Sequence, residues 1–180
     1  MGETRVVAVE GHDGAGKSSV ARILADRLNA RYVRPFGPPV GAQLSALRDV
    51  GAFDEMLTVA RRAIHDAVST AAAPLVVSDR HWVTVLTMAA LRVGDLTSDW
   101  FPLPDTVVLW TDVQTTRRRH LQRGESPSAL DRDVRYCAAF RRVSRELGLP
   151  LLDTTHRTPA ETADEVAAVL GLAHRPYALP

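Results

Sequence analysis

Short apolar runs rich in β-branched residues alternate along the chain with longer segments whose apolar residues recur at helical spacing. The short runs predict strands over residues 5–9, 31–34, 74–78, 105–111 and 149–153. The longer segments predict helices over residues 16–29, 54–72 (capped by Asp54), 82–92, 113–123, 126–147 and 158–171, the last opening with a capping box and ending at Gly171. This alternation predicts an α/β fold in three layers, with a five-stranded parallel sheet and helices on both faces.

Length and composition are typical of one soluble domain spanning residues 1–180. The chain is 46% hydrophobic and 24% charged, and it shows neither an internal repeat nor a linker between domains. Residues 35–41 are rich in proline and glycine and are expected to end the second strand. Residues 173–180 are expected to form a loose tail.

Charge and cysteine content exclude several classes of protein. A formal net charge of +1 argues against a dedicated nucleic-acid binder, which normally carries a clear basic excess. The single cysteine, Cys137, excludes an internal disulfide framework and is expected to be a buried structural residue. No run approaches the roughly 20 apolar residues of a membrane span, and no leader pattern precedes the first strand. We therefore expect a cytoplasmic protein without a membrane partner.

The basic residues are distributed unusually, because 21 are arginines and only Lys17 is a lysine. A chain that uses arginine for every other cation has kept one compact ammonium group. Such a point charge suits a position between phosphate groups.

Lys17 lies in the segment that carries the most specific signal, residues 11–18 (GHDGAGKS), which matches G-x-x-x-x-G-K-[ST] between a strand and a helix. The glycines let backbone N–H groups point into one hollow at a helix N-terminus. We expect Lys17 to reach the β- and γ-phosphates of ATP and Ser18 to bind Mg²⁺. The expected donor-binding residues are Gly11, His12, Asp13, Gly14, Ala15, Gly16, Lys17, Ser18 and Ser19. The motif makes the predicted α/β fold that of a P-loop NTPase.

Residues further along the chain favour a kinase. A GTPase would need Asn-Lys-x-Asp to read guanine, which a chain with one lysine, in the P-loop, cannot supply. Asp79 and Arg80 follow a buried strand, so Asp79 could hold Mg²⁺ through water and Arg80 could clamp an acceptor phosphate. Arg119 and Arg123 are four residues apart and could close over the γ-phosphate.

Residues 7–19 (VAVEGHDGAGKSS) resemble the opening of the thymidylate kinases, whose loop reads E-G-x-D-G-x-G-K-S/T. Residues 34–41, 60–65, 78–81 and 119–125 resemble the R-E-P-G-G-T-P-x-G, A-D-R, D-R-Y and R-x-x-x-R-G-E segments of that family, in the same order. The resemblance implies that Asp13 faces the acceptor and metal region. It also implies acceptor contacts from Arg34, Arg62 and Arg80, a lid over residues 117–128, adenine near residues 154–158, and a homodimer. Phe36 could equally pack on an acceptor base or cap the core.

Three features depart from the family pattern. Residues 82–89 contain neither the Tyr nor the Gln that help to read the acceptor there, and Arg34-Pro35-Phe36 lacks the family's Glu. The chain is also shorter between Arg92 and Leu103. A pyrimidine edge therefore cannot be read in the family's way.

The predicted reaction transfers the γ-phosphate of ATP to a nucleoside monophosphate, either dTMP or a related or modified nucleotide, in nucleotide biosynthesis. Deoxynucleoside kinases and specialised-metabolite kinases are the nearest alternative. They need a general base for a hydroxyl, usually a glutamate at the end of the second strand, where this chain has Arg34. A nucleotide-binding module without catalysis is the second alternative.

Overall fold

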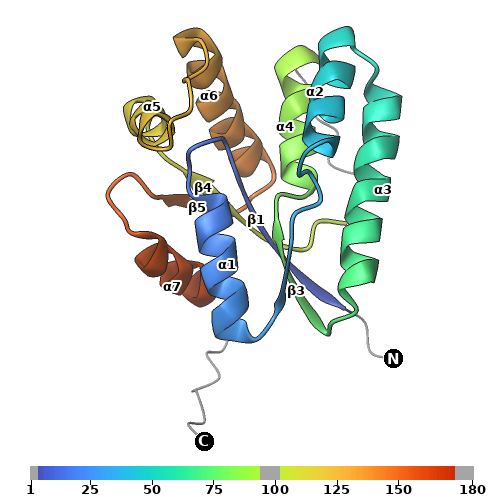
Figure 1. Ribbon diagram of the computed structural model, residues 1–180, viewed down its shortest axis with the longest axis vertical. Helices are drawn as coiled ribbons and strands as arrows, with labels where there is room; N and C mark the ends of the chain where they lie inside the picture. Colours follow the sequence, from blue (N-terminus) through green and yellow to red (C-terminus); the bar gives the residue numbers. More distant parts are fainter. Residues whose placement is uncertain (1–3, 94–101, 173–180) are drawn as a thin grey trace, which may run out of the picture.

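Five parallel strands form a single sheet in the computed structural model, which describes residues 4–93 and 102–172. The strands are β1 (Arg5–Gly11), β2 (Arg31–Val33), β3 (Leu75–Asp79), β4 (Asp105–Trp110) and β5 (Leu151–Asp153), and they lie in the order β2-β3-β1-β4-β5 (Figure 1). Because all strands run in one direction, the loops that follow their carboxyl ends gather at one edge of the sheet. The predicted five-stranded parallel sheet is confirmed.

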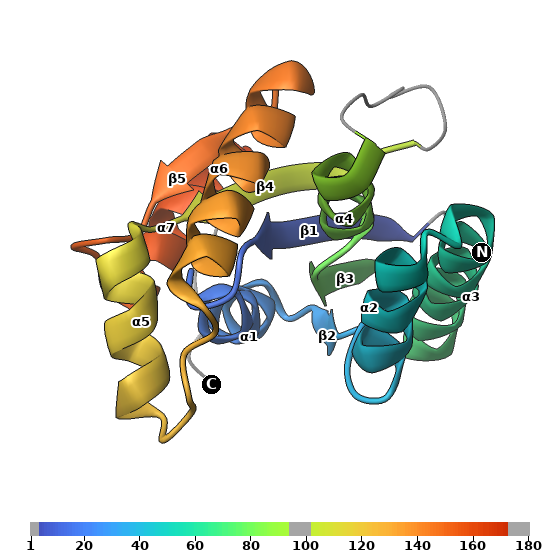
Figure 2. The same ribbon diagram turned by 90° about the horizontal axis from the view of Figure 1, so that it is seen from above.

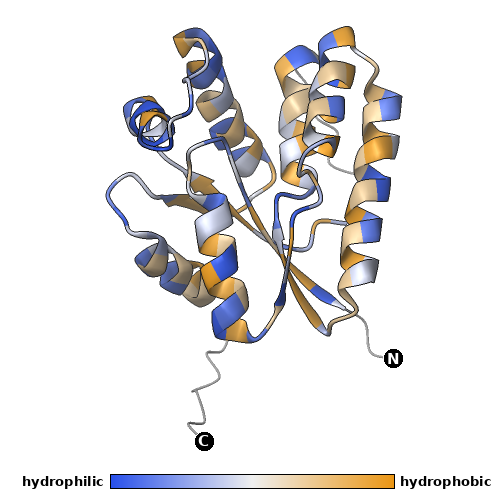
Figure 3. Ribbon diagram, viewed as in Figure 1, coloured by the Kyte–Doolittle hydropathy of each residue, from blue (hydrophilic) through white to orange (hydrophobic). Residues whose placement is uncertain are grey.

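The helices are α1 (Lys17–Leu28), α2 (Val40–Val50), α3 (Phe53–Ala71), α4 (Trp82–Val93), α5 (Val113–Gln122), α6 (Leu130–Glu146) and α7 (Pro159–Val169). On one face of the sheet, Val7 and Val9 of β1 pack in one core cluster with α1 and α7. On the opposite face, Val108 of β4 packs with α4 and α6, as the view from above shows (Figure 2). A third cluster joins α2, α3 and α4. The strands are mostly apolar, whereas α5 is largely hydrophilic (Figure 3).

Two helix starts differ from the sequence prediction. Asp54 does not cap α3, because the N-cap residue is Ala52. Asp54 lies in the first turn instead, where its negative charge interacts favourably with the positive end of the helix dipole. Helix α6 begins at Leu130 instead of residue 126. Arg117 binds the carbonyl oxygen of Ser128 at 2.8 Å, and Ser128 Oγ binds Asp133, so this segment is held outside the helix.

One helix, α2, was not predicted, because it follows directly on the expected break at residues 35–41. Its buried face consists only of Leu44 and Arg48, which leaves a weak apolar signal in the sequence. The capping box of α7 is confirmed, since Thr158 Oγ1 accepts from the N–H of Glu161, and Glu161 accepts from the N–H of Thr158.

The tail expected at residues 173–180 lies outside the described residues, as does most of the stretch between Arg92 and Leu103. Among the helices that the structure describes, none combines the length and apolar character needed to cross a membrane.

Candidate active site

The loop between β1 and α1 folds tightly against the end of β4. Gly11 has a φ of 136°, and a Cβ at this position would lie 2.1 Å from the carbonyl oxygen of Leu109. Gly14 has a φ of 80°, and its Cβ would lie 3.0 Å from the side chain of Thr116 at the start of α5. Only glycine fits these two positions without displacing a neighbouring segment.

His12 is buried, with 2% of its surface exposed, and joins the loop to β4. Its Nδ1 donates to the carbonyl oxygen of Asp13 at 2.8 Å, and its Nε2 accepts from the N–H of Thr111 at 3.1 Å. Burial and the nearby Lys17 charge lower the pKa of His12 to about 4. The imidazole is therefore neutral near pH 7, and its two hydrogen bonds hold the P-loop against the end of β4. The P-loop motif does not indicate this structural role.

Lys17 points into the hollow of the loop, where its Nζ donates to the carbonyl oxygen of His12 at 2.7 Å. Its exposed fraction is 5%. Desolvation, followed by repulsion from Arg80, lowers the pKa of Lys17 to about 7. An anion in the hollow would favour the charged ammonium form, because it would offset both effects.

Ser18 and Asp79 meet where the loop passes the end of β3. Ser18 Oγ donates to Asp79 Oδ2 at 2.5 Å, and the hydroxyl of Tyr32 donates to the same oxygen at 2.9 Å. Arg34 Nε lies 3.7 Å from Asp79 Oδ2. The other carboxylate oxygen, Asp79 Oδ1, is buried and has no hydrogen-bond partner among the described residues.

This arrangement fits the predicted Mg²⁺ site, because a hydroxyl stands beside a buried carboxylate with one unsatisfied oxygen. Mg²⁺ binds oxygen ligands and keeps several waters, so Ser18 could bind it directly and Asp79 through water. Within the part of the chain that the structure describes, no three His, Cys, Asp or Glu side chains are grouped to hold a metal ion by themselves. Tyr32, which helps to orient Asp79, was missed by sequence reasoning.

Arg80 forms an ion pair with Asp13, so the residue after β3 contacts the middle of the P-loop. Its Nη1 also donates to the carbonyl oxygen of Gly11 at 3.3 Å and to Thr84 Oγ1 at 3.2 Å. Neighbouring atoms partly desolvate the Asp13 carboxylate, which raises its pKa, although 71% of the side chain is exposed. The charges of Arg80 and Lys17 outweigh this effect and hold the pKa of Asp13 well below the usual range.

Glu10, at the end of β1, holds the turn that carries Arg80. Its fully buried carboxylate accepts from the N–H of His81 at 2.7 Å and from the N–H and hydroxyl of Thr84 at 3.0 and 2.6 Å. Burial raises the pKa of Glu10. An acidic residue inside an apolar strand was the available signal for this role, and sequence reasoning missed it.

A cavity of about 190 Å³ opens on the Arg80 side of the loop. Asp13, Arg34, Phe36 and Arg80, all predicted acceptor-binding residues, line it. Phe36 also belongs to the core cluster of α2, α3 and α4, so it lies both in the core and at the cavity wall, and contact with an acceptor base stays a prediction. The wall is completed by residues that sequence reasoning missed: Gly41, Leu44 and Ser45 of α2, Thr84 and Met88 of α4, and Arg132, Tyr136 and Phe140 of α6.

Arg62 does not line this cavity. It lies on α3 with a side chain that is 84% exposed, and its Nε is 3.7 Å from Asp66 Oδ2. The structure therefore separates Arg62 from the other predicted acceptor-binding residues.

A second cavity, of about 220 Å³, lies on the opposite side of the loop. Arg119 crosses it, donating to the carbonyl oxygens of Gly14 at 2.9 Å and Thr154 at 2.7 Å. Arg123 also lines it, and its guanidinium pairs with Glu125 at 2.9 Å. Ser19 and Thr154, which were expected near the donor nucleotide, contribute to the same wall.

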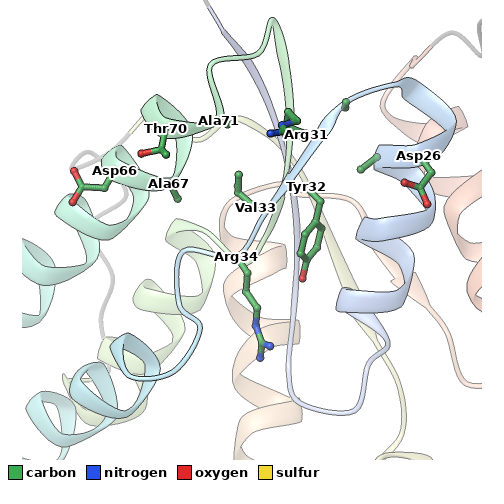
Figure 4. Close-up of a pocket in the computed structure, with 11 residues that line it drawn as sticks. Asp26, Arg31, Tyr32, Val33, Arg34, Asp66, Ala67, Thr70 and Ala71 are labelled. Carbon is green, nitrogen blue, oxygen red and sulfur yellow. The ribbon is translucent and has the colours of Figure 1, made fainter.

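A hollow of about 810 Å³ lies at edge strand β2 between α1 and α3 (Figure 4). No P-loop residue lines it. In Figure 4, Tyr32 and Arg34 point to the same side of β2, as side chains two residues apart on a strand do. This hollow is therefore separate from the phosphate-binding loop.

No protein-family model and no curated protein sequence matches the chain. Solved structures do match in fold. A deoxyadenosine kinase from M. mycoides gives a TM-score of 0.67 at 13% identity, covering 93% of this chain and 100% of that one. A thymidylate kinase from Candida albicans gives 0.66 at 16% identity, covering 93% and 91%. A shikimate kinase from Acinetobacter baumannii gives 0.59 at 16% identity, covering 93% and 94%.

These structural similarities span nearly the whole chain, and the matched proteins are kinases that are named for different small molecules. At such low identity they concern the fold. This protein has the fold of the P-loop kinases.

Proposed function

We propose that the protein is an ATP-dependent phosphotransferase that moves the γ-phosphate of ATP to a nucleoside monophosphate, either dTMP or a related or modified nucleotide. The loop amides and Lys17 bind the donor phosphates, and the adenine lies in the cavity near Thr154. Ser18, and Asp79 through water, would hold Mg²⁺, which when bound would neutralise charge on the phosphates. Residues 117–128 act as the lid, with Arg119 contacting the donor side.

The observation that carries this proposal is the charge in the acceptor cavity. Arg34 and Arg80 line it from strand ends, and Arg132 of α6 also lines it. Among the lining residues that the structure describes, Asp13 is the one carboxylate, and it is paired with Arg80. A phosphate acceptor is already a nucleophile, so its binding site needs positive charge and alignment more than it needs a base. Bidentate arginine contacts supply both.

Transfer to a hydroxyl is the second candidate, and Asp13 is the observation in its favour. A carboxylate in the cavity could accept the hydroxyl proton. However, Arg80 and Lys17 hold the pKa of Asp13 below its usual range, which makes this carboxylate a weak base. We therefore favour the monophosphate acceptor.

A coupled assay of ADP release tests the proposal, with Mg²⁺ and ATP and a panel of nucleoside monophosphates and nucleosides. Turnover with at least one monophosphate and not with the matching nucleoside is the expected result. Turnover restricted to nucleosides or other alcohols would assign the second candidate. ATP binding without turnover on any acceptor would indicate a non-catalytic module.

The homodimer that the family resemblance implies stays a prediction. Light scattering on the purified protein measures it directly, because a dimer doubles the molar mass of the chain.

A further inference from the structure

A further cavity, of about 320 Å³, lies between α2, α4 and α6 and borders the acceptor cavity. Arg132 and Tyr136 of α6 line both cavities and so form the boundary between them. In Figure 1, α2, α4 and α6 extend past the end of the sheet at which the P-loop lies. Because the two cavities share Arg132 and Tyr136, this cavity is within reach of a molecule bound beside Arg80.

Arginines dominate this cavity. Its lining comprises Arg48, Arg92, Arg132 and Arg135, with one carboxylate from Asp49, together with Leu91 and Tyr136. Four like charges around one hollow repel one another. Two carboxylates, Asp49 in the lining and Asp131, which pairs with Arg135 at 3.2 Å, offset only part of that repulsion. An anion inside the hollow would relieve the rest.

The four arginines are held in place to different degrees. Arg48 is buried, with a side chain 10% exposed, and is bonded to Asp49 at 2.7 Å and to the hydroxyl of Tyr136. Arg92 donates to the carbonyl oxygen of Asp49. Arg132 lies 5.6 Å from the centre of the Tyr136 ring and has no hydrogen bond or ion pair with any residue that the structure describes. Its guanidinium is therefore available to a ligand.

Two of the four arginines, Arg48 and Arg135, have a carboxylate partner, as do single arginines elsewhere on the surface. Arg27 pairs with Asp164 at 2.6 Å, and Arg117 pairs with Asp133 at 2.8 Å. The arginine-lined cavity differs because its cations outnumber its carboxylates and because they converge from three helices. An arginine-rich composition alone does not produce this convergence.

We propose that the arginine-lined cavity binds a second anionic group, a phosphate or a carboxylate, that belongs to the acceptor itself. This inference rests on the proposed function, since it takes the cavity of Arg34 and Arg80 as the site of the accepting phosphate. The acceptor then carries one anion beside Arg80 and another beyond Arg132. Guanidinium groups bind either kind of oxyanion in bidentate fashion, so the two anions fix the orientation of the acceptor.

The test compares binding of nucleoside 5′-monophosphates with binding of nucleotides that carry a second anion. The probes are the 2′,5′- and 3′,5′-bisphosphates and orotidine 5′-monophosphate, measured by calorimetry in the presence of an unreactive ATP analogue. The variant Arg92→Gln/Arg135→Gln removes two cations that line only the arginine-lined cavity. Arg142→Gln/Arg145→Gln is the matched control, because it also removes two cations from a helix surface. Arg142 bonds a backbone carbonyl oxygen, as Arg92 does, and lies 3.7 Å from Glu146, much as Arg135 lies 3.2 Å from Asp131.

We expect at least one probe to bind about tenfold more tightly than its monophosphate counterpart, a difference that one good charge-assisted contact supplies. The Arg92/Arg135 variant should lose this advantage and keep its affinity for monophosphates, while the control variant keeps both. Equal affinity for every probe and its monophosphate overturns the inference, as does an advantage that survives in the Arg92/Arg135 variant.

A separate arm distinguishes a free anion from an acceptor group. Inorganic pyrophosphate should compete with the favoured probe and not with the monophosphate. Pyrophosphate that binds without competing with the probe would mean an independent anion site and would overturn the inference. Failure of the proposed function gives a different result from failure of this inference, because no monophosphate would then be phosphorylated even though ATP binds.

Discussion

The imidazole of His12 accepts a hydrogen bond from the backbone N–H of Thr111 at 3.1 Å, which fastens the P-loop to the end of β4. The same ring donates to the carbonyl oxygen of Asp13, while the carbonyl oxygen of His12 accepts from Lys17. One residue thus orients both the aspartate and the lysine of the loop. The motif itself allows any residue at this position, so the clamp is a property of this chain.

Replacing His12 should lower kcat/KM for ATP by an amount that depends on how many of its hydrogen bonds are lost. In His12→Gln the side-chain amide can still accept from Thr111, whereas His12→Ala removes both ring hydrogen bonds and leaves a cavity. We expect kcat/KM for ATP to fall about tenfold in His12→Gln and about a hundredfold in His12→Ala, the range of one to two buried hydrogen bonds. Steady-state kinetics with circular dichroism as a folding control measure this. Equal losses in the two variants would mean that ring packing, not hydrogen bonding, sets the loop.

Binding of ATP should be linked to proton uptake by Lys17. Without a ligand the pKa of Lys17 is about 7, and a bound phosphate raises this pKa. The affinity for ATP is therefore highest below pH 7, where Lys17 is already protonated, and it falls as the pH rises above 7. Calorimetry at pH 8 in buffers of different ionisation enthalpy should reveal uptake of a fraction of one proton. Lys17→Met supplies the comparison, because it has no group to protonate at this position. Identical proton uptake in the two proteins would contradict the assignment.

The contact between Tyr32 and Asp79 should tune the requirement for Mg²⁺. Asp79→Asn removes the charge that holds the water shell of the ion, and we expect activity to fall by about two orders of magnitude. Tyr32→Phe removes one hydrogen bond to Asp79 and should change the Mg²⁺ activation constant by only a few-fold. Measuring activity as a function of Mg²⁺ concentration at saturating ATP distinguishes the effects of the two variants. A wild-type response in Asp79→Asn would place the ion elsewhere.

Arg80 and Arg62 offer a direct comparison between two arginines that the family resemblance assigns to the acceptor. Arg80→Ala should lower kcat/KM for the acceptor by about a hundredfold or more, while ATP affinity changes less than about threefold, since Arg80 faces the acceptor cavity. Arg62→Ala should behave as wild type, because its side chain is exposed and outside that cavity. Equal losses of ATP and acceptor binding in Arg80→Ala would contradict this assignment. A large acceptor defect in Arg62→Ala would require α3 to move on binding.

The sequence by itself determined the donor side of the site. A strand, a glycine loop and a helix are contiguous in the chain, so local spacing alone places Gly11, Lys17 and Ser18 together. Apolar runs predict the parallel sheet, and a parallel sheet places Asp79 beside the P-loop because both follow the carboxyl ends of neighbouring strands. The capping box of α7 was equally local.

The acceptor side was decided by tertiary structure. Tyr136 and Arg132 reach the cavity only because α6 packs against α4, about fifty residues earlier in the chain, and no local pattern encodes that approach. Arg62 has the right neighbours in sequence, yet the rotation of α3 turns its side chain to solvent. Hydrogen bonds of Glu10 and His12 to distant backbone groups are likewise invisible in the sequence, because side chains identify a donor or acceptor and only packing supplies its partner.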